Sequence, residues 1–161
     1  MSLTGRAYLS SPVGDILIES EEEKITAVLF NRDNPRLEET RTPVIEQCIL
    51  ELEEYFDKGR KFFTVELDLR GSDFQKRVWT ELLAIPYGKT ESYETLAIRV
   101  GDVKAIRAVG LANNKNPIAI IVPCHRVIGK NGDLVGYGGG LDNKEWLLHH
   151  EGSILKQLSL F

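Results

Sequence analysis

The amino-acid sequence predicts two units in one chain: an α/β unit over residues 1–70 and a mainly helical unit over residues 71–161. Three observations predict this division. Alternating apolar segments flank one amphipathic helix in the first half, and a helix-capping motif followed by short helices fills the second. The charge also differs, because residues 1–70 hold 9 Lys and Arg against 15 Asp and Glu, whereas residues 71–161 hold 11 against 9.

The first half is predicted to contain a hairpin, a helix and a further strand. Alternation over residues 16–19 and 25–30 predicts two paired strands across an acidic turn. The 3–4 spacing of apolar residues over 44–56 predicts a helix that ends near Gly59. Cys48 falls on the apolar stripe of that helix and is predicted to be structural. A further strand is predicted over residues 63–69.

The second half opens with a capping box, Ser72 with Gln75, which predicts a helix that ends before the Pro-Tyr-Gly of residues 86–88. Two short helices are then predicted over residues 93–100 and 104–113, joined at Gly101. This is the pattern of a helix-turn-helix, although helical hairpins often pack without any ligand. Five cations against one Asp over residues 101–130 favour a polyanionic partner for this half.

Cys124 is the residue that most clearly points to chemistry. The β-branched run of residues 118–122 predicts a buried strand, and Pro123 ends it. Cys124 would then lie where a rigid element leaves the core, beside His125 and Arg126, and both neighbours favour a thiolate. On the local sequence alone, a small buried hydrophobic residue remains the alternative.

The segment after Cys124 is rich in glycine. Residues 130–133 (Lys-Asn-Gly-Asp) predict a type I′ hairpin turn, and the loop of residues 136–140 is not a P-loop because no Gly-Lys-Ser/Thr follows it. A last helix is predicted over residues 142–151, ending at Gly152. Glu151 in its final turn is either a solvated surface residue or a carboxylate that orients a histidine.

Composition excludes several classes of protein. Two cysteines and three histidines form neither a disulfide framework nor a zinc motif. No cleavable signal pattern opens the chain, and no apolar run is long enough to span a membrane. We expect a monomer in the reducing cytoplasm, without membrane association, metal or cofactor.

Several motifs occur together in this chain: Pro-Cys-His-Arg-Val at 123–127, Ser-Tyr-Glu-Thr-Leu-Ala at 92–97, Ile-Arg-Ala-Val-Gly at 106–110, Asn116-Pro117, and the segment 136–152 ending in His-His-Glu-Gly. In combination they resemble the O6-alkylguanine-DNA alkyltransferases. The resemblance covers nearly the whole chain. It implies a ribonuclease-H-like α/β N-terminal domain and a mainly α C-terminal domain with a helix-turn-helix, and alkylated double-stranded DNA as the partner.

The resemblance also implies the roles of individual residues. Cys124 would accept the alkyl group, His125 would activate it through a water, Glu151 would orient His125, and Tyr93 would assist the leaving guanine. Arg107 would fill the stack after the nucleotide is flipped out. The further DNA-binding residues would be Ala105, Ala108, Asn113, Lys104, Lys115 and Arg126. Asn116, Val127, Tyr137, Gly138 and Gly139 would form the hinge and the base pocket.

Two other functions remain compatible with the sequence. A thiol hydrolase would use Cys124 with a histidine from elsewhere in the chain, such as His149 or His150. A DNA-binding regulator would use the helix-turn-helix and would not need Cys124. A hydrolase would release product repeatedly, whereas an alkyltransferase would stop after one reaction per molecule. If replacing Cys124 abolishes the effect of the protein while DNA binding remains, the regulator is excluded.

Overall fold

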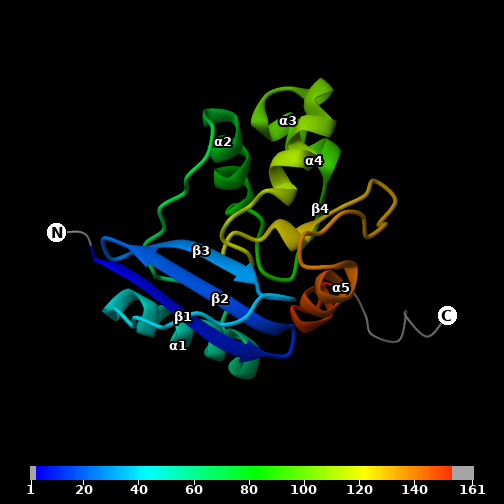
Figure 1. Ribbon diagram of the computed structural model, residues 1–161. Helices are drawn as coiled ribbons and strands as arrows, with labels where there is room; N and C mark the ends of the chain where they lie inside the picture. The colour runs from blue at the N-terminus through cyan, green and yellow to red at the C-terminus, as the bar shows by residue number, and fades with distance from the viewer. Residues whose placement is uncertain (1–2, 154–161) are drawn as a thin grey trace. The chain divides into compact units, whose positions relative to one another are not determined.

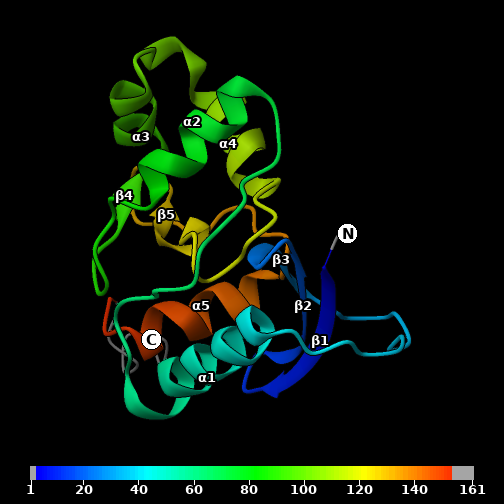
Figure 2. The same ribbon diagram turned by 90° about the vertical axis from the view of Figure 1, so that its left-hand side faces the viewer.

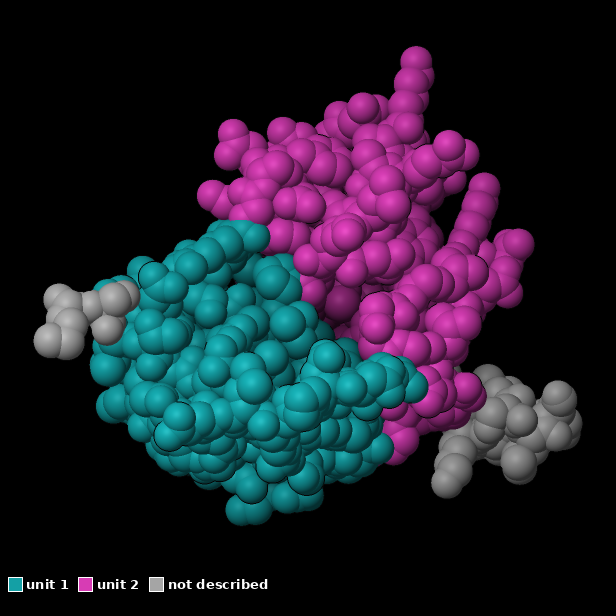
Figure 3. Space-filling model, in the orientation of Figure 1, with its two compact units in different colours: residues 1–70, 117–119 teal, residues 71–116, 120–161 magenta. Residues whose placement is uncertain are grey.

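The computed structural model of the protein describes residues 3–153, which belong to two compact units (Figure 3). Unit 1 runs to Arg70 and adds the segment Pro117–Ala119. Unit 2 holds Gly71–Asn116 and resumes at Ile120. The return of three residues to unit 1 has no counterpart in the sequence analysis.

Unit 1 is built on a three-stranded antiparallel sheet, β1 (Thr4–Ser11), β2 (Gly14–Glu21) and β3 (Lys24–Phe30), in that order (Figure 1). The hairpin predicted across the acidic turn is confirmed. Its turn residues Glu22 and Glu23 both have positive φ, 53° and 59°, as a two-residue type I′ turn requires. Strand β1 was not predicted from the sequence, because its buried positions do not alternate regularly.

One long helix covers a face of this sheet. Helix α1 (Pro43–Lys58) begins at the N-cap Thr42, whose side chain accepts a hydrogen bond from the Ile45 amide, and ends at Gly59 in the left-handed region. Its buried stripe includes Cys48, which is fully buried, as predicted. This packing of one amphipathic stripe on the sheet forms the core of unit 1.

The outer edge of β3 is shared by two later segments. Ile25 pairs with Leu67, and Val28 pairs with Ile118, each through a single bridge. The strand predicted over residues 63–69 is therefore wrong, because only Leu67 of that segment pairs with β3. The strand predicted over residues 118–122 is also wrong. Those five residues are all buried, but only Ile118 pairs, and the chain turns at Ile120 with a φ of 72°.

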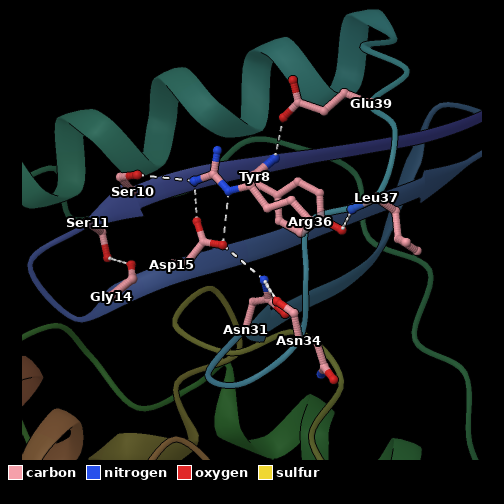
Figure 4. Close-up of polar contacts among 10 residues, drawn as sticks. All are labelled: Tyr8, Ser10, Ser11, Gly14, Asp15, Asn31, Asn34, Arg36, Leu37 and Glu39. Carbon is pink, nitrogen blue, oxygen red and sulfur yellow. Dashed lines mark hydrogen bonds and ion pairs between the residues drawn. The ribbon is translucent and has the colours of Figure 1, made fainter.

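A polar network fastens the loop after β3 to the sheet (Figure 4). Arg36 binds the carboxylate of Asp15 through two donors and also donates to Ser10 Oγ at 3.1 Å. The Leu37 amide donates to the Tyr8 hydroxyl at 2.9 Å, and the Tyr8 amide donates to Glu39 at 2.8 Å. These contacts account for the ordered path of a loop that has no secondary structure of its own.

Three helices gather in unit 2 (Figure 2). Helix α2 (Asp73–Leu82) begins with the predicted capping box, in which both reciprocal hydrogen bonds are present. Helix α3 (Tyr93–Val100) ends at Gly101 with a φ of 109°, a 3-10 turn η1 (Val103–Ala105) follows, and α4 (Ile106–Asn114) completes the group. The Trp79 indole of α2 donates to the Ala112 carbonyl of α4 at 2.8 Å, which fixes these two helices together.

The rest of unit 2 frames the Cys124 segment. Strand β4 (Glu91–Ser92) pairs in parallel with β5 (Val127–Ile128), and helix α5 (Leu141–His150) packs against the 3-10 turn η2 (Cys124–Arg126). The predicted type I′ turn is wrong, because the turn spans Gly129–Gly132 and its central residues Lys130 and Asn131 do not have positive φ. Between residues 3 and 153, no helix is both long and apolar enough to cross a membrane.

Candidate active site

Cys124 opens the 3-10 turn η2 rather than following a strand. The side chains of a 3-10 turn point about 120° apart, since there are three residues per turn. Cys124, His125 and Arg126 therefore point in three directions although they are adjacent in sequence. Within residues 3–153 the His125 ring bonds Glu151, and no hydrogen bond joins it to the Cys124 thiol.

His125 and Glu151 form a buried pair. His125 Nε2 lies 2.7 Å from Glu151 Oε2, and both side chains are inaccessible to solvent. Because the Glu151 carboxylate can only accept a hydrogen bond, the neutral ring of His125 carries its proton on Nε2 and has a lone pair at Nδ1. Nδ1 is buried and has no protein partner among the described residues. Glu151 is therefore not a surface residue, and the geometry fits the alternative in which it orients a histidine.

Arg126 occupies the other side of the same carboxylate. Its Nε donates to Glu151 Oε1 at 2.7 Å, its Nη2 donates to Oε2 at 3.2 Å, and its Nη1 donates to the Ile85 carbonyl at 2.7 Å. Arg126 is 7% exposed. The expectation that Arg126 contacts DNA is therefore corrected: its guanidinium is buried and engaged inside unit 2.

His125 and Arg126 keep Glu151 ionised. Burial raises the pKa of this carboxyl, but the hydrogen bonds and charges of His125 and Arg126 outweigh burial and lower the pKa to about 2. Burial also lowers the pKa of His125, which counteracts the attraction of Glu151. At neutral pH the arrangement is a neutral imidazole beside an ionised carboxylate.

The Cys124 thiol lies in an environment that disfavours the thiolate at rest. Burial raises its pKa, and this is only partly offset by a hydrogen bond with Asn116, the charge of Lys144 and a hydrogen bond with Tyr137. The expectation that His125 and Arg126 lower the pKa of the thiol is therefore wrong, because Arg126 turns to Glu151 instead. A thiol that is protonated at rest needs a base when it reacts.

Lys144 is a member of the site that the sequence analysis missed. It is 0% exposed, its Nζ donates to the Val135 carbonyl at 3.0 Å, and Nζ lies 5.8 Å from the centroid of the Tyr93 ring. Burial lowers its pKa to about 8. Lys144 precedes the buried Leu147 and Leu148 by three and four residues, so all three lie on one face of the helix. This spacing was the signal in the sequence that Lys144 faces inward.

Three of the other expected site residues, Asn116, Tyr137 and Tyr93, lie near Cys124. Asn116 Nδ2 donates to the Val122 carbonyl at 2.8 Å, and the buried Tyr137 hydroxyl interacts with the Cys124 thiol. Tyr93 donates to the Val135 carbonyl at 3.1 Å, and burial and the nearby Cys124 raise its pKa, so it remains a proton donor. Val127 and Gly139 are buried, whereas Gly138 is exposed.

The expected DNA contacts divide into exposed and buried residues. Arg107, Lys104, Lys115 and Ala108 are exposed, and Ala105 is partly exposed. Asn113 is 1% exposed and donates from Nδ2 to the Cys124 carbonyl at 3.3 Å. The expectation that Asn113 contacts DNA is therefore corrected, because its side chain faces the cysteine. Within residues 3–153, no three His, Cys, Asp or Glu are placed to hold a metal ion.

Both units match domains of one protein family. Residues 73–153 match the model of the 6-O-methylguanine DNA methyltransferase DNA binding domain, and residues 6–69 match that of its ribonuclease-like domain. The methylated-DNA–protein-cysteine methyltransferase of Methanosarcina acetivorans is 49% identical over 152 residues, which cover 91% of this chain and 97% of the relative.

Solved structures of Mycobacterium tuberculosis proteins agree with the sequence matches. The O6-methylguanine methyltransferase of that organism has a TM-score of 0.85 and 42% identity, with 99% of each chain covered. Its OGT in complex with DNA has a TM-score of 0.83 and 46% identity, with 96% of this chain and 97% of that chain covered. With matched domains across both units and a curated relative of nearly the same length, this chain belongs to the methylated-DNA–protein-cysteine methyltransferase family.

Proposed function

We propose that this protein repairs DNA by moving the alkyl group of O6-alkylguanine to the sulfur of Cys124, once per molecule. The observation that carries the proposal is the buried Cys124 thiol beside a neutral His125 held by Glu151. Membership of the family and the DNA complex of the M. tuberculosis OGT support DNA as the partner. O4-alkylthymine, which carries the same type of alkyl carbon, is the second candidate substrate.

The chemical step balances within these residues. His125 Nδ1 takes the thiol proton through a water, and the thiolate attacks the alkyl carbon, which is a soft centre for substitution. A sulfur–carbon bond forms as the bond between that carbon and guanine O6 breaks. The electron pair remains on guanine, which regains a proton from the Tyr93 hydroxyl, and the proton held by His125 replaces the one that Tyr93 gave.

The end state explains why each molecule acts once. A thioether on Cys124 offers water no leaving group, so the thiol is not regenerated. The protein is thus an acceptor as well as a catalyst.

We assign DNA binding and alkyl acceptance to residues 71–161. In this proposal α3, the Gly101 turn and the helix formed by η1 and α4 act as a helix-turn-helix that lies in the minor groove. Arg107, exposed on α4, fills the space of the flipped nucleotide. Exposed Lys104 and Lys115 contact phosphates, and the small Ala105 and Ala108 allow close approach.

Asn116, Val127, Tyr137, Gly138 and Gly139 line the hinge and base pocket in this assignment. Residues 1–70 form a ribonuclease-H-like domain. The protein acts as a cytoplasmic monomer.

The test is intact mass after mixing the protein with duplex DNA that carries one O6-methylguanine. The protein should gain one methyl group, about 14 Da by atomic arithmetic, on the peptide that contains Cys124. Cys124→Ala should gain no mass, and the matched control Cys48→Ala should gain one methyl group, as the wild-type protein does. Repeated turnover with unmodified protein would instead indicate a thiol hydrolase, and DNA binding without transfer would indicate a regulator.

A further inference from the structure

The guanidinium of Arg126 and the imidazole of His125 share one buried carboxylate. Glu151 Oε2 accepts hydrogen bonds from His125 Nε2 at 2.7 Å and from Arg126 Nη2 at 3.2 Å. Glu151 Oε1 accepts a hydrogen bond from Arg126 Nε at 2.7 Å. Arg126 therefore grips both oxygens in a two-pronged contact, which is the geometry in which an arginine binds a carboxylate most strongly. Neither the exposed DNA contacts nor the chemical step above uses this residue.

A buried carboxylate that faced His125 alone would have a predictable effect. An opposite charge within hydrogen-bonding distance favours the protonated ring, and burial strengthens the attraction. Burial of the ring lowers the pKa of His125 and opposes this attraction, so the charge of the ring depends on how strongly Glu151 favours the imidazolium, which cannot accept the thiol proton. Arg126 changes this balance, because its fixed positive charge cancels the charge of Glu151 as His125 experiences it.

We propose that Arg126 is a positioning residue of the transfer reaction: by neutralising Glu151 it keeps His125 uncharged, with Nδ1 free to accept a proton. The other charged or titratable groups near His125 act in the same direction or are neutral. Lys144 of α5 adds a second positive charge that disfavours the imidazolium, and Cys124 is an uncharged thiol at rest. The Tyr87 ring lies 5.7 Å from the Arg126 guanidinium carbon and carries no charge at neutral pH.

The proposal also assigns the Ile85 contact a purpose. Nη1 donates to the Ile85 carbonyl at 2.7 Å, so the guanidinium is held by a main-chain acceptor as well as by the Glu151 carboxylate. This inference rests on the proposed function, because it concerns the base of the transfer step.

The first measurement does not need a substrate. The protonation of His125 is followed by NMR of 15N-labelled imidazole against pH, and the three histidines are assigned by replacing His149 and His150 singly. In Arg126→Met the pKa of His125 should rise by about one unit or more, because Glu151 then faces the ring uncompensated. Arg126→Met/Glu151→Gln removes both charges and should return His125 to the neutral state.

The second measurement is the rate of methyl transfer to Cys124 against pH. Arg126→Met should slow transfer at pH 7 by about tenfold or more, with the acid limb of the profile moved upward as far as the pKa of His125 has moved. The matched control is Arg99→Met, which removes an arginine that binds Glu81 and Glu91 and has no contact with Glu151. It should leave both the His125 titration and the shape of the profile unchanged.

Arg126→Lys decides the matter should Arg126→Met fail to fold. It keeps the charge and loses the two-pronged contact, so His125 should remain neutral at pH 7. A protonated His125 in folded Arg126→Lys, or an unchanged His125 titration in folded Arg126→Met, would overturn the inference. A wild-type protein that acquires no methyl group would instead overturn the proposed function, and the imidazole titration would still test the role of Arg126.

Discussion

Asn113 donates a hydrogen bond from Nδ2 to the main-chain carbonyl of Cys124 at 3.3 Å. The donor belongs to α4, the helix that carries Arg107, and the acceptor belongs to the 3-10 turn of the candidate acceptor residue. Three residues further on, just beyond α4, Asn116 donates to the Val122 carbonyl on the other side of Pro123. The end of α4 and the residues after it thus fix the backbone of the Cys124 loop at two points.

Replacement of Asn113 tests this attachment. Asn113→Ala should lower the free energy of unfolding by about 1–2 kcal/mol, because a buried hydrogen bond is lost and the Cys124 carbonyl loses a donor. Transfer to Cys124 should also slow, since the loop is less well held. The neighbouring Asn114→Ala is the control, because Asn114 is exposed. Chemical denaturation and single-turnover transfer are the measurements, and equal effects of the two variants would contradict the prediction.

Arg107→Ala should separate flipping from chemistry. If Arg107 fills the stack, its loss should slow transfer from duplex DNA by about tenfold or more, from the few kcal/mol that unstacking costs. Transfer from free O6-methylguanine base should change little, because no nucleotide is flipped. Rates on both substrates give the comparison, with exposed Lys130→Met as the control. Equal losses on the two substrates would make Arg107 a structural residue.

Lys144→Met should make Cys124 less reactive. The charge of Lys144 lowers the pKa of the thiol, so its removal should raise that pKa further and slow alkylation by iodoacetamide at pH 8 several-fold. The pKa of Lys144 itself is about 8, so its contribution should fade as the pH rises through that value. Alkylation rates of the two proteins from pH 6 to pH 10 should therefore converge at the alkaline end. Parallel profiles with a constant difference would refute this account.

Glu151 should remain ionised in strong acid. Its pKa is lowered from 4.5 to about 2, so its stabilising effect is fully present above pH 4.5 and is lost as the pH falls toward 2. The corresponding loss in the free energy of unfolding is about 3 kcal/mol across that window. Carboxyl 13C NMR measures the ionisation directly, with the signal assigned by its absence in Glu151→Gln. A midpoint near 4.5 would show that the pair with Arg126 and His125 does not stabilise the carboxylate.

Cys48 should be inert in the folded protein. It is fully buried in α1, and burial followed by the charge of Glu51 raises its pKa to about 12. Iodoacetamide at pH 8 should therefore leave Cys48 unlabelled in the native protein and label it in guanidinium chloride. Peptide mass mapping reads the two sites separately. Native labelling at Cys48 would show that unit 1 opens on the time scale of the reaction.

The helices were the most predictable part of the fold. Thr42 and Ser72 cap α1 and α2, Ser92 caps α3, and Gly59 and Gly101 end α1 and α3, so each of these boundaries depends on local chemistry. The segments 63–69 and 118–122 were predicted as strands and are not, although the second is buried throughout. An apolar β-branched run indicates burial, but a strand also needs a partner edge, and β3 gives each of these segments a single bridge.

The sequence by itself determined the chemical groups: a cysteine after a buried run, a histidine beside it, a carboxylate at the end of the last helix and a family that uses all three. Only the tertiary structure decided how they are used. In the folded chain Arg126 binds Glu151, Lys144 lies near enough to Cys124 to affect its pKa, and the buried Asn113 donates to the Cys124 carbonyl. The physical reason is that a side chain's charge and partner depend on what burial leaves within a few ångströms, and residues 25 positions apart meet only once the chain has folded.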